Sequence, residues 1–304
     1  MSTALRKRQA LDAQELADVR ALIHHVTEAD GLSPISEHAL LHLHRGADAR
    51  STHLLAYEDG VLAGYAHLDV TDGVAGPSAE LAVAPEFRRT GIGRLLVQTL
   101  IEEHPGRRLR LWAHGEQAAA GQLAAAMGFR RIRVLWQMRR SLLAPLPPVV
   151  LPAGVRLTSF QPGIDEEVWL DLNAVAFAAH PEQGSWRSED LSIRMAEPWF
   201  DASGFLMAWA DGELAGFHWT KVHGGESAHE DIGEVYVVAV SPAWRGTGLG
   251  RALTIAGLRH LRSAGLHQAM LYVDAENLAA IHLYETLGFA RWDTDVMYAR
   301  LPAG

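Results

Sequence analysis

Residues 81–94 read LAVAPEFRRTGIGR, and residues 237–251 read VVAVSPAWRGTGLGR. In each stretch an apolar run typical of a buried strand leads through a proline into a turn with two glycines, and an amphipathic segment follows at once. Glycine permits a positive φ and a close backbone approach, so several free N–H groups can converge at the positive end of a helix dipole. This arrangement favours a pyrophosphate site, to which the flanking Arg88 and Arg245 can add positive charge.

The two stretches belong to a longer internal repeat. The hairpin pattern at residues 57–65, around an Asp-Gly turn, recurs at 209–217. The Gly-Phe pair that ends residues 126–129 recurs at the end of 286–289. The offsets of 152, 157 and 160 residues grow in one order, which indicates a duplicated domain with small loop insertions.

A proline-rich stretch separates the two copies. Its prolines are Pro145, Pro147, Pro148 and Pro152. Such a segment can neither continue a helix nor lie in a central strand. We therefore expect an N-terminal domain at residues 1–141, a linker at 142–153 and a C-terminal domain at 154–304. In each domain helices, a hairpin and further strands follow an α+β (α/β) pattern built around one sheet.

The composition is that of an ordinary globular protein, with 48% hydrophobic and 21% charged residues in a chain of 304. No apolar run approaches the roughly 18 residues of a membrane helix, and the N-terminus lacks the apolar centre of a signal peptide. We therefore expect a cytoplasmic protein without a membrane partner. The chain has no cysteine, which excludes disulfides, zinc–cysteine sites and a cysteine nucleophile.

The net charge of −9 is unevenly distributed. Residues 1–148 carry 17 Lys and Arg against 16 Asp and Glu, a net of +1, and residues 149–304 carry 10 against 20, a net of −10. An acidic half argues against a nucleic-acid partner, because binding phosphates needs clustered positive charge. It suits a cationic substrate such as an amine; an acidic surface that only keeps the domain soluble is the alternative.

Both glycine turns match the acetyl-CoA signature of the GCN5-related N-acetyltransferase (GNAT) family, Arg/Gln-x-x-Gly-x-Gly/Ala after a strand, and nearly the whole chain resembles two such domains in tandem. The resemblance implies a mixed, mainly antiparallel central sheet flanked by helices in each domain, with the CoA pyrophosphate at the turn and the pantetheine along the preceding strand. The residues expected to bind acetyl-CoA are Leu81, Ala82, Val83, Arg88, Arg89, Thr90, Gly91, Ile92 and Gly93 in the first domain, and Val238, Ala239, Val240, Arg245, Gly246, Thr247, Gly248, Leu249, Gly250, Arg251 and Asn277 in the second. Neither turn has the third glycine of a dinucleotide-binding motif or the lysine of a P-loop.

Acetyl transfer to an amine needs a deprotonated amine, a polarised thioester carbonyl and a protonated leaving thiolate. Glu234 lies at the start of the strand that carries the acetyl end of the donor, which suits a general base acting directly or through a water. Tyr284 lies where, by the resemblance, the general acid of the family protonates the CoA sulfur. The alternatives are a surface salt bridge for Glu234 and a packing role for Tyr284.

The two halves differ at these positions. The repeat offsets pair Glu234 with Pro77, Tyr284 with Ala124, and Asn277 with Gln117. The first domain thus keeps the phosphate turn and lacks both proton-transfer groups. We expect a catalytic second domain and a degenerate first domain that can still hold acetyl-CoA. Without a cysteine to carry the acetyl group, we expect direct transfer within a ternary complex.

Several stretches resemble one branch of the family: residues 31–37, 112–115, 180–186 and 216–223. That branch acetylates the free cysteinyl amine of a cysteine–glucosamine–inositol conjugate, the last step of mycothiol synthesis in actinobacteria. The resemblance implies that the acceptor contacts Glu37, Glu182, Lys221, Glu234 and Tyr284. Carboxylates suit an ammonium group and hydroxyls. Lys221 is one of two lysines against 25 arginines, and an exposed strand-end lysine is the alternative for it.

His180, His218 and His223 lack the helical spacing of a zinc pair, so we expect loop or sheet-edge histidines and no metal. Two other functions remain open, an acetyltransferase for a different small amine such as an aminoglycoside or amino acid, and a non-catalytic acyl-CoA-sensing protein. The presence of both a candidate base and a candidate acid argues against the sensor. We expect a monomer that takes a small-molecule substrate.

Overall fold

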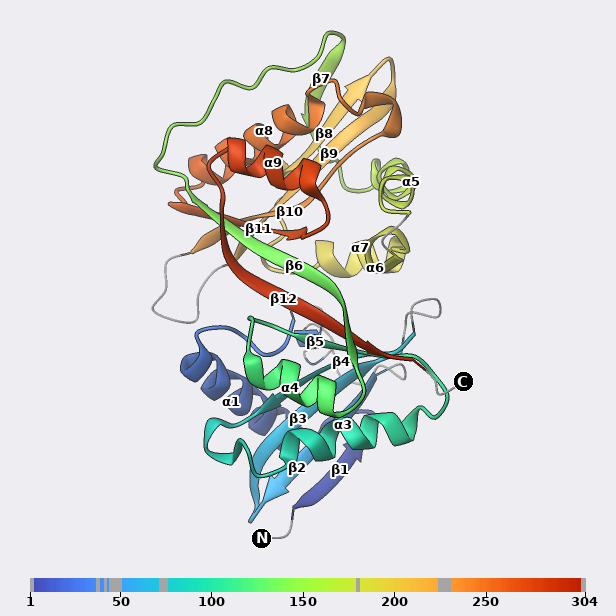
Figure 1. Ribbon diagram of the computed structural model, residues 1–304. Helices are drawn as coiled ribbons and strands as arrows, with labels where there is room; N and C mark the ends of the chain where they lie inside the picture. The colour runs from blue at the N-terminus through green and yellow to red at the C-terminus, as the bar shows by residue number, and fades with distance from the viewer. Residues whose placement is uncertain are drawn as a thin grey trace. The chain divides into compact units, whose positions relative to one another are not determined.

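The computed structural model describes residues 3–36, 39–40, 43, 51–70, 76–178, 181–223 and 231–301. The chain forms two compact units (Figure 1). Unit 1 consists of residues 1–135 and 293–304, and unit 2 consists of residues 136–292. No helix in the described ranges is both long and apolar enough to cross a membrane.

Unit 1 contains a sheet with the strand order β1-β2-β3-β4-β5-β12, in which only β4 and β5 run parallel to each other. Its strands are β1 (Ala4–Arg8), β2 (Ser51–Glu58), β3 (Val61–Asp69), β4 (Ser78–Val83), β5 (Leu109–Ala113) and β12 (Ala290–Arg300). Its helices are α1 (Ala13–Asp30), α3 (Ile92–Glu103) and α4 (Ala118–Ala126), with a short 3₁₀ helix at Pro85–Phe87. The apolar side of α3, with Leu96 and Leu100, is buried in the unit's core.

Unit 2 repeats the order as β7-β8-β9-β10-β11-β6. Its strands are the part of β6 (Arg130–Ser141) from Trp136 on, β7 (Val155–Ser159), β8 (Phe205–Ala210), β9 (Glu213–His223), β10 (Ile232–Val240) and β11 (Gln268–Asp274). Its helices are α5 (Glu166–Ala176), α6 (Pro181–Gly184), α7 (Ser188–Met195), α8 (Leu249–Ser263) and α9 (Leu278–Thr286), with 3₁₀ helices at Ala202–Gly204 and Pro242–Trp244. The Asp-Gly pairs at 59–60 and 211–212 connect the hairpins β2–β3 and β8–β9, where the sequence predicts them.

The limits of the two units differ from the domain limits expected at residues 141 and 154. The last strand of the chain, β12, pairs antiparallel with β5 in unit 1, through Val296–Arg300. The last strand of the first half, β6, lies beside β11 instead. A sequence repeat marks what was duplicated, whereas strand pairing decides what is compact, and equivalent last strands can exchange places. Residues 142–154, between β6 and β7, contain no helix or strand.

The strand β9 is buried on both sides, as expected for a central strand. On one side Trp169 of α5 contacts Phe205, Phe217 and Trp219, and the rings of Phe205 and Trp219 stack with centroids 4.4 Å apart. All four of these aromatic side chains are fully buried. The other side packs on α8, whose Leu253 is fully buried.

His218 lies in the middle of β9 and is fully buried, so the expectation of a loop or sheet-edge histidine is wrong for it. Its Nδ1 lies 2.8 Å from the carbonyl oxygen of Leu253 in α8. Burial lowers the pKa of His218 to about 4, so the ring is neutral and Nδ1–H donates this bond. A Cβ atom at Gly257 would lie 2.0 Å from the ring. The histidine therefore fits against α8 because residue 257 has no side chain.

We expect Gly257→Ala to lower the free energy of unfolding by about 2–3 kcal/mol, because the new methyl group displaces the His218 ring and its hydrogen bond. Urea unfolding followed by tryptophan fluorescence measures this, since eight of the nine tryptophans lie in unit 2. Gly250→Ala in the same helix is the matched control, because its Cβ would meet only the Val240 side chain at 3.5 Å. The penalty at residue 257 should largely disappear in a His218→Ala background; an equal penalty there would contradict this account.

A polar cluster in unit 1 joins two of the stretches that the sequence singles out. The His114 side chain, 12% exposed, lies 3.6 Å from Glu80 on β4 and 3.3 Å from Asp295 on β12. Glu80 also accepts hydrogen bonds from the backbone N–H and the hydroxyl of Ser36. Burial opposes the charged imidazolium, but its interactions with the Asp295 and Glu80 carboxylates outweigh it and raise the pKa of His114 to about 10. The ring is therefore charged at neutral pH.

The raised pKa makes stability depend on pH. An unfolded histidine titrates near 6.5, so the stabilisation by His114 is complete below that pH and is lost as the pH rises through about 10. We expect the stability difference between the wild type and His114→Gln to shrink from pH 7 to pH 10, as measured by urea unfolding followed by circular dichroism. His24→Gln, at an exposed histidine of α1, is the control and should show no such trend. A constant difference for His114→Gln would show that the ring is not charged.

Candidate active site and cofactor-binding turn

The two glycine turns have the same backbone conformation. In unit 2, Gly246 and Gly248 have φ values of 76° and 88°, and α8 begins directly after them. In unit 1 the matching residues Arg89 and Gly91 have φ values of 67° and 103°. A positive φ is costly for a residue with a side chain, so the turn favours glycine at these positions. Arg89 adopts it at some cost in energy.

Each turn is closed by a threonine and leaves space for a ligand. The hydroxyl of Thr90 donates to the Phe87 carbonyl at 2.6 Å, and that of Thr247 donates to the Trp244 carbonyl at 2.8 Å. A Cβ built at Gly248 would have no neighbour within 4 Å. The first N–H groups of a helix have no partner within it and carry the positive end of its dipole. The turns of both units can therefore bind a phosphate group.

The arginines beside the two turns differ in their contacts. Arg88 forms two hydrogen bonds to the Asp30 carboxylate, of 2.9 and 2.7 Å. These bonds to Arg88 lower the pKa of Asp30. Arg245 is exposed, and within the described residues the structure gives its guanidinium no partner. Only the arginine of unit 2 is thus directly available to a phosphate.

In both units a gap between two parallel strands lies directly before the turn in the chain. The parallel pairing of β10 with β11 covers only Ile232–Glu234, so the residues Val238–Val240 have no partner on that side in the described part of the chain. Likewise, β4 pairs with β5 only through Ser78–Glu80, which leaves Leu81–Val83 without one. Backbone N–H and C=O groups without a strand partner can bind an extended ligand that carries amides, such as pantetheine.

A bulge distinguishes β10 from β4. The register of β10 against β9 shifts between Val235 and Val237, which makes Tyr236 an extra residue, while β4 pairs with β3 without a shift. The extra residue changes the structural counterpart of Glu234. Glu234 pairs with Lys221 and Met270, and the equivalent position in unit 1 is Ser78, which pairs with Asp69 and Arg110. Pro77, the counterpart expected from a constant offset, is therefore one residue out of register, although unit 1 still has no carboxylate there.

Glu234 lies at the point where β10 leaves β11. It is buried, with 6% exposed. Its Oε2 lies 2.7 Å from Nε2 of His223, near the end of β9. The structure thus brings together a glutamate that the sequence singles out and a histidine whose role the sequence does not indicate.

Lys221 is buried rather than exposed at a strand end, with 4% exposed. Its Nζ lies 4.8 Å from the centre of the Trp199 ring and 5.6 Å from that of Tyr236, as cation–π contacts. Arg194 of α7 donates from Nε to the Tyr236 hydroxyl at 2.9 Å. Glu234, Lys221, Arg194 and these two rings form one patch, which we call the acceptor patch. Sequence reasoning missed Arg194, Trp199 and Tyr236, because nothing local marks them as neighbours of β9.

Tyr284 lies on α9, buried against Phe289 with ring centroids 5.8 Å apart. Burial raises the pKa of Tyr284 to about 12, so its hydroxyl keeps its proton at neutral pH and can donate it. Asn277 is the N-cap of α9, and its Oδ1 accepts the N–H of Ala280 at 3.1 Å. Its Nδ2 hydrogens remain donors for a ligand.

The equivalence of Tyr284 with Ala124 agrees with the backbone. In unit 2 the backbone N–H of Phe289 donates to the carbonyl oxygen of Tyr284 at 3.0 Å. In unit 1 the N–H of Phe129 donates to the carbonyl oxygen of Ala124 at 2.9 Å. Two expected acceptor contacts cannot be placed. Glu37 lies outside the described residues, and Glu182 lies in α6 with a side chain outside them.

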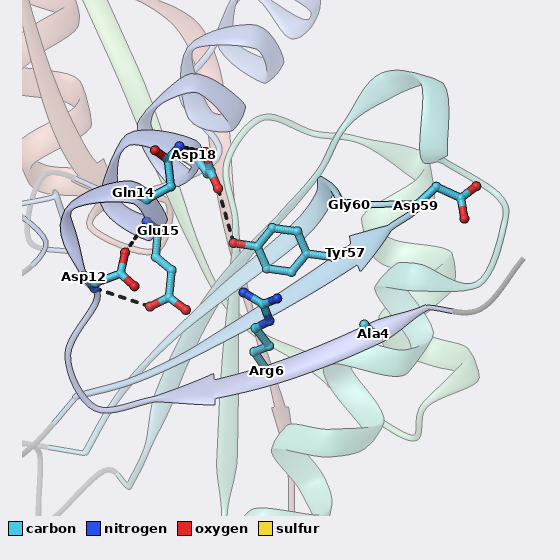
Figure 2. A pocket seen from close by; sticks show the side chains of 9 residues that line it. All are labelled: Ala4, Arg6, Asp12, Gln14, Glu15, Asp18, Tyr57, Asp59 and Gly60. Atoms are coloured by element: carbon cyan, nitrogen blue, oxygen red, sulfur yellow. Dashed lines mark hydrogen bonds between the residues drawn. The ribbon is translucent and has the colours of Figure 1, made fainter.

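A hollow of about 440 Å³ in unit 1 lies apart from every expected site residue. Figure 2 shows it beside the N-terminal end of α1, with the Tyr57 hydroxyl pointing to Asp18, to which it donates at 3.3 Å. Its lining residues are Ala4, Arg6, Asp12, Gln14, Glu15, Asp18, Tyr57, Asp59 and Gly60. It contains no phosphate turn and none of the residues expected to take part in acetyl transfer.

The class of protein follows from the fold, the two turns and a family profile. The profile of the Acetyltransferase (GNAT) family matches residues 19–129 and again residues 167–289, so the chain belongs to this family. Two tandem GNAT domains, each with a mixed and mainly antiparallel sheet, were expected from the sequence, and this expectation is confirmed. Members of the family use acetyl-CoA as the acetyl donor.

Two curated proteins and two solved structures are similar to this chain over nearly its full length. The mycothiol acetyltransferase of Acidothermus cellulolyticus is 55% identical over 94% of this chain and 91% of its own length. That of Thermobispora bispora is 56% identical over 93% of this chain and 95% of its own length. A GCN5-related N-acetyltransferase from Sphaerobacter thermophilus has a TM-score of 0.73 at 26% identity, covering 97% of this chain and 95% of that one. A tandem GNAT protein from the clavulanic acid biosynthesis pathway has a TM-score of 0.75 at 21% identity, covering 100% of both chains, and supports the fold alone.

Proposed function

We propose that this protein transfers acetyl from acetyl-CoA to the cysteinyl amine of the cysteine–glucosamine–inositol conjugate, the final step of mycothiol biosynthesis. The observation that carries the proposal is identity above 50%, over more than nine-tenths of the chain, to relatives named mycothiol acetyltransferase. The buried acceptor patch of unit 2 supports it with suitable chemistry. The Glu234 carboxylate suits the ammonium group of the acceptor. Lys221, with its two aromatic neighbours, suits the hydroxyl groups and ring faces of the sugar and inositol.

In this proposal each step of the acetyl transfer is assigned to a residue or backbone group of unit 2. Glu234 removes a proton from the acceptor ammonium, which frees the nitrogen lone pair. The N–C bond forms as the C–S bond of the thioester breaks. Backbone N–H groups of Val238–Val240 stabilise the charge that develops on the carbonyl oxygen, and Tyr284 donates a proton to the leaving sulfur.

Binding is assigned to the turn, the strand gap and the acceptor patch. The turn 245–250 and Arg251 hold the pyrophosphate, and the backbone of Val238–Val240 holds the pantetheine. Asn277 offers its Nδ2 group to the donor. Lys221 contacts the acceptor, and Glu37 and Glu182 remain proposed acceptor contacts from the family pattern.

Unit 1 is proposed to be a degenerate copy. It has Ser78 and Ala124 where unit 2 has the base and the acid, and its turn arginine is bonded to Asp30. Its phosphate turn is intact, so it can hold acetyl-CoA without turning it over. We also propose a cytoplasmic monomer without nucleic-acid or membrane partners.

An acceptor panel tests the function. Release of free CoA thiol is measured with the cysteinyl pseudodisaccharide, with glucosaminyl-inositol and with cysteine. The proposal expects a kcat/KM at least about a hundredfold higher for the first, because a buried polar site rejects an acceptor that leaves its groups unpaired. Preference for another amine would identify a different acetyltransferase of the same family. Acetyl-CoA binding without thiol release would identify the sensor.

We expect Glu234→Gln and Tyr284→Phe each to lower kcat by about 10²–10⁴, the usual effect of removing a general base or acid. Single-turnover acetyl transfer measures this with purified protein. Glu213→Gln, at an exposed position of β9, and Tyr57→Phe in unit 1 are the matched controls and should leave kcat unchanged. Wild-type rates in both site variants would refute the assignment of base and acid.

The two phosphate turns offer a second, internally matched comparison. Gly248→Ala and Gly91→Ala introduce the same strain at a positive φ, with no steric neighbour in either case. We expect Gly248→Ala to raise the KM for acetyl-CoA about tenfold or more and Gly91→Ala to leave turnover within about twofold, because only the turn of unit 2 serves the reaction. Loss of turnover in a well-folded Gly91→Ala protein would show that unit 1 takes part.

A further inference from the structure

One histidine of unit 2 contacts the proposed base and has no role in the mechanism above. Nε2 of His223 lies 2.7 Å from Oε2 of Glu234. The two residues come from adjacent strands, β9 and β10; the direct register partner of His223 is Ile232, and Glu234 lies two residues further along β10. This contact is short enough for a strong, charge-assisted hydrogen bond.

The pair connects a buried group with water. The Glu234 side chain is 8% exposed, and the His223 side chain is 34% exposed. Within the described residues, His223 is the only hydrogen-bonding partner of the Glu234 carboxylate, which leaves Oε1 available to the acceptor amine. The imidazole is therefore in contact with both the candidate base and the solvent.

The neighbouring strands and helix place charged and apolar residues around the His223–Glu234 pair. On β9, Lys221 is the register partner of Glu234, and on α7, Arg194 bonds to Tyr236, two residues further along β10. Asp231 precedes β10 in the chain. On β11 the register partner of Glu234 is the apolar Met270. Lys221 thus lies beside the glutamate in the sheet, and His223 is the neighbour whose ring can both accept and donate a proton.

The stoichiometry of amide formation requires an exit for a proton. The acceptor nitrogen starts as an ammonium with three hydrogens and ends as an amide with one. One of the two lost protons balances the proton that ends on the CoA sulfur, and the other must leave the site. Because Glu234 is buried, this proton needs a path from its carboxylate to water.

We propose that His223 positions the Glu234 carboxylate and carries its proton to solvent; this inference rests on the function proposed above. Glu234 takes a proton from the ammonium and becomes a carboxylic acid. It passes that proton to Nε2 of His223, and the resulting imidazolium releases a proton to water. Glu234 returns to the carboxylate, and His223 returns to the neutral ring.

Two substitutions separate positioning from proton transfer. His223→Ala removes both, and we expect kcat to fall about 10–100-fold with an unchanged KM for acetyl-CoA, in the range of a lost proton-transfer group. Added imidazole should restore a large part of this rate. His223→Gln keeps an N–H donor for Glu234 but cannot titrate, so it should retain more activity while the kcat–pH profile loses one ionisation. His24→Gln, at an exposed histidine of unit 1, should match the wild type throughout.

Two outcomes would overturn the inference. One is a His223→Gln enzyme with the wild-type kcat and pH profile, and the other is a His223→Ala enzyme that imidazole does not rescue at any pH. Failure of the proposed function is distinguishable, because the wild-type protein would then release no thiol with the cysteinyl acceptor. In the expected case the wild type turns over, and only the histidine variants change.

Discussion

The parallel pairing of β10 with β11 stops after three residue pairs, and the rest of the site depends on this early end. Buried backbone groups need hydrogen-bonding partners, so a sheet that opens inside a unit must be completed by something other than a strand. The opening exposes the amides of Val238–Val240, and the glycine turn follows directly at the end of the same strand. Glu234 lies at the last paired position. A single local feature of the sheet thus aligns the glycine turn, the unpaired backbone groups of Val238–Val240 and the candidate base.

Comparison of the two units shows which features belong to the fold and which to the chemistry. The opening between parallel strands and the turn with its two positive φ values occur twice, in sequences that differ at most positions. In the proposed function they are the features that bind the CoA part of the donor. The bulge at Tyr236, the carboxylate at 234 and the tyrosine at 284 occur once. The bulge inserts Tyr236 between Glu234 and the segment Val238–Val240, and the candidate base at 234 lies directly opposite Lys221. Unit 1 fills the equivalent region with an ionised network around His114.

Much of the fold could be predicted from short segments. The Asp-Gly turns, the helices after the glycine turns and the strands before them each depend on neighbouring residues, and all were found where expected. The candidate site was harder. Glu234 and Tyr284 stood out because their counterparts in the repeat lack the same groups. Lys221 is an expected acceptor contact with an exposed strand-end position as the alternative; the structure buries it beside Trp199, in the turn after α7, and Tyr236 of β10. A constant offset pairs Glu234 with Pro77, whereas the structure pairs it with Ser78. An offset without gaps cannot detect the extra residue of a bulge.

By itself, the sequence determined that the chain is a duplicated acetyltransferase domain with two phosphate turns and only one candidate set of proton-transfer groups. These features follow from residue type and from spacing along the chain, because φ preferences and helix starts are local. Only the tertiary structure decided which strand completes each sheet, which residue of unit 1 stands opposite Glu234, and that His223 contacts the base while His218 is buried against a glycine of α8. Those facts depend on hydrogen-bond register and packing between segments far apart in sequence, where one extra residue or one missing side chain changes which groups meet.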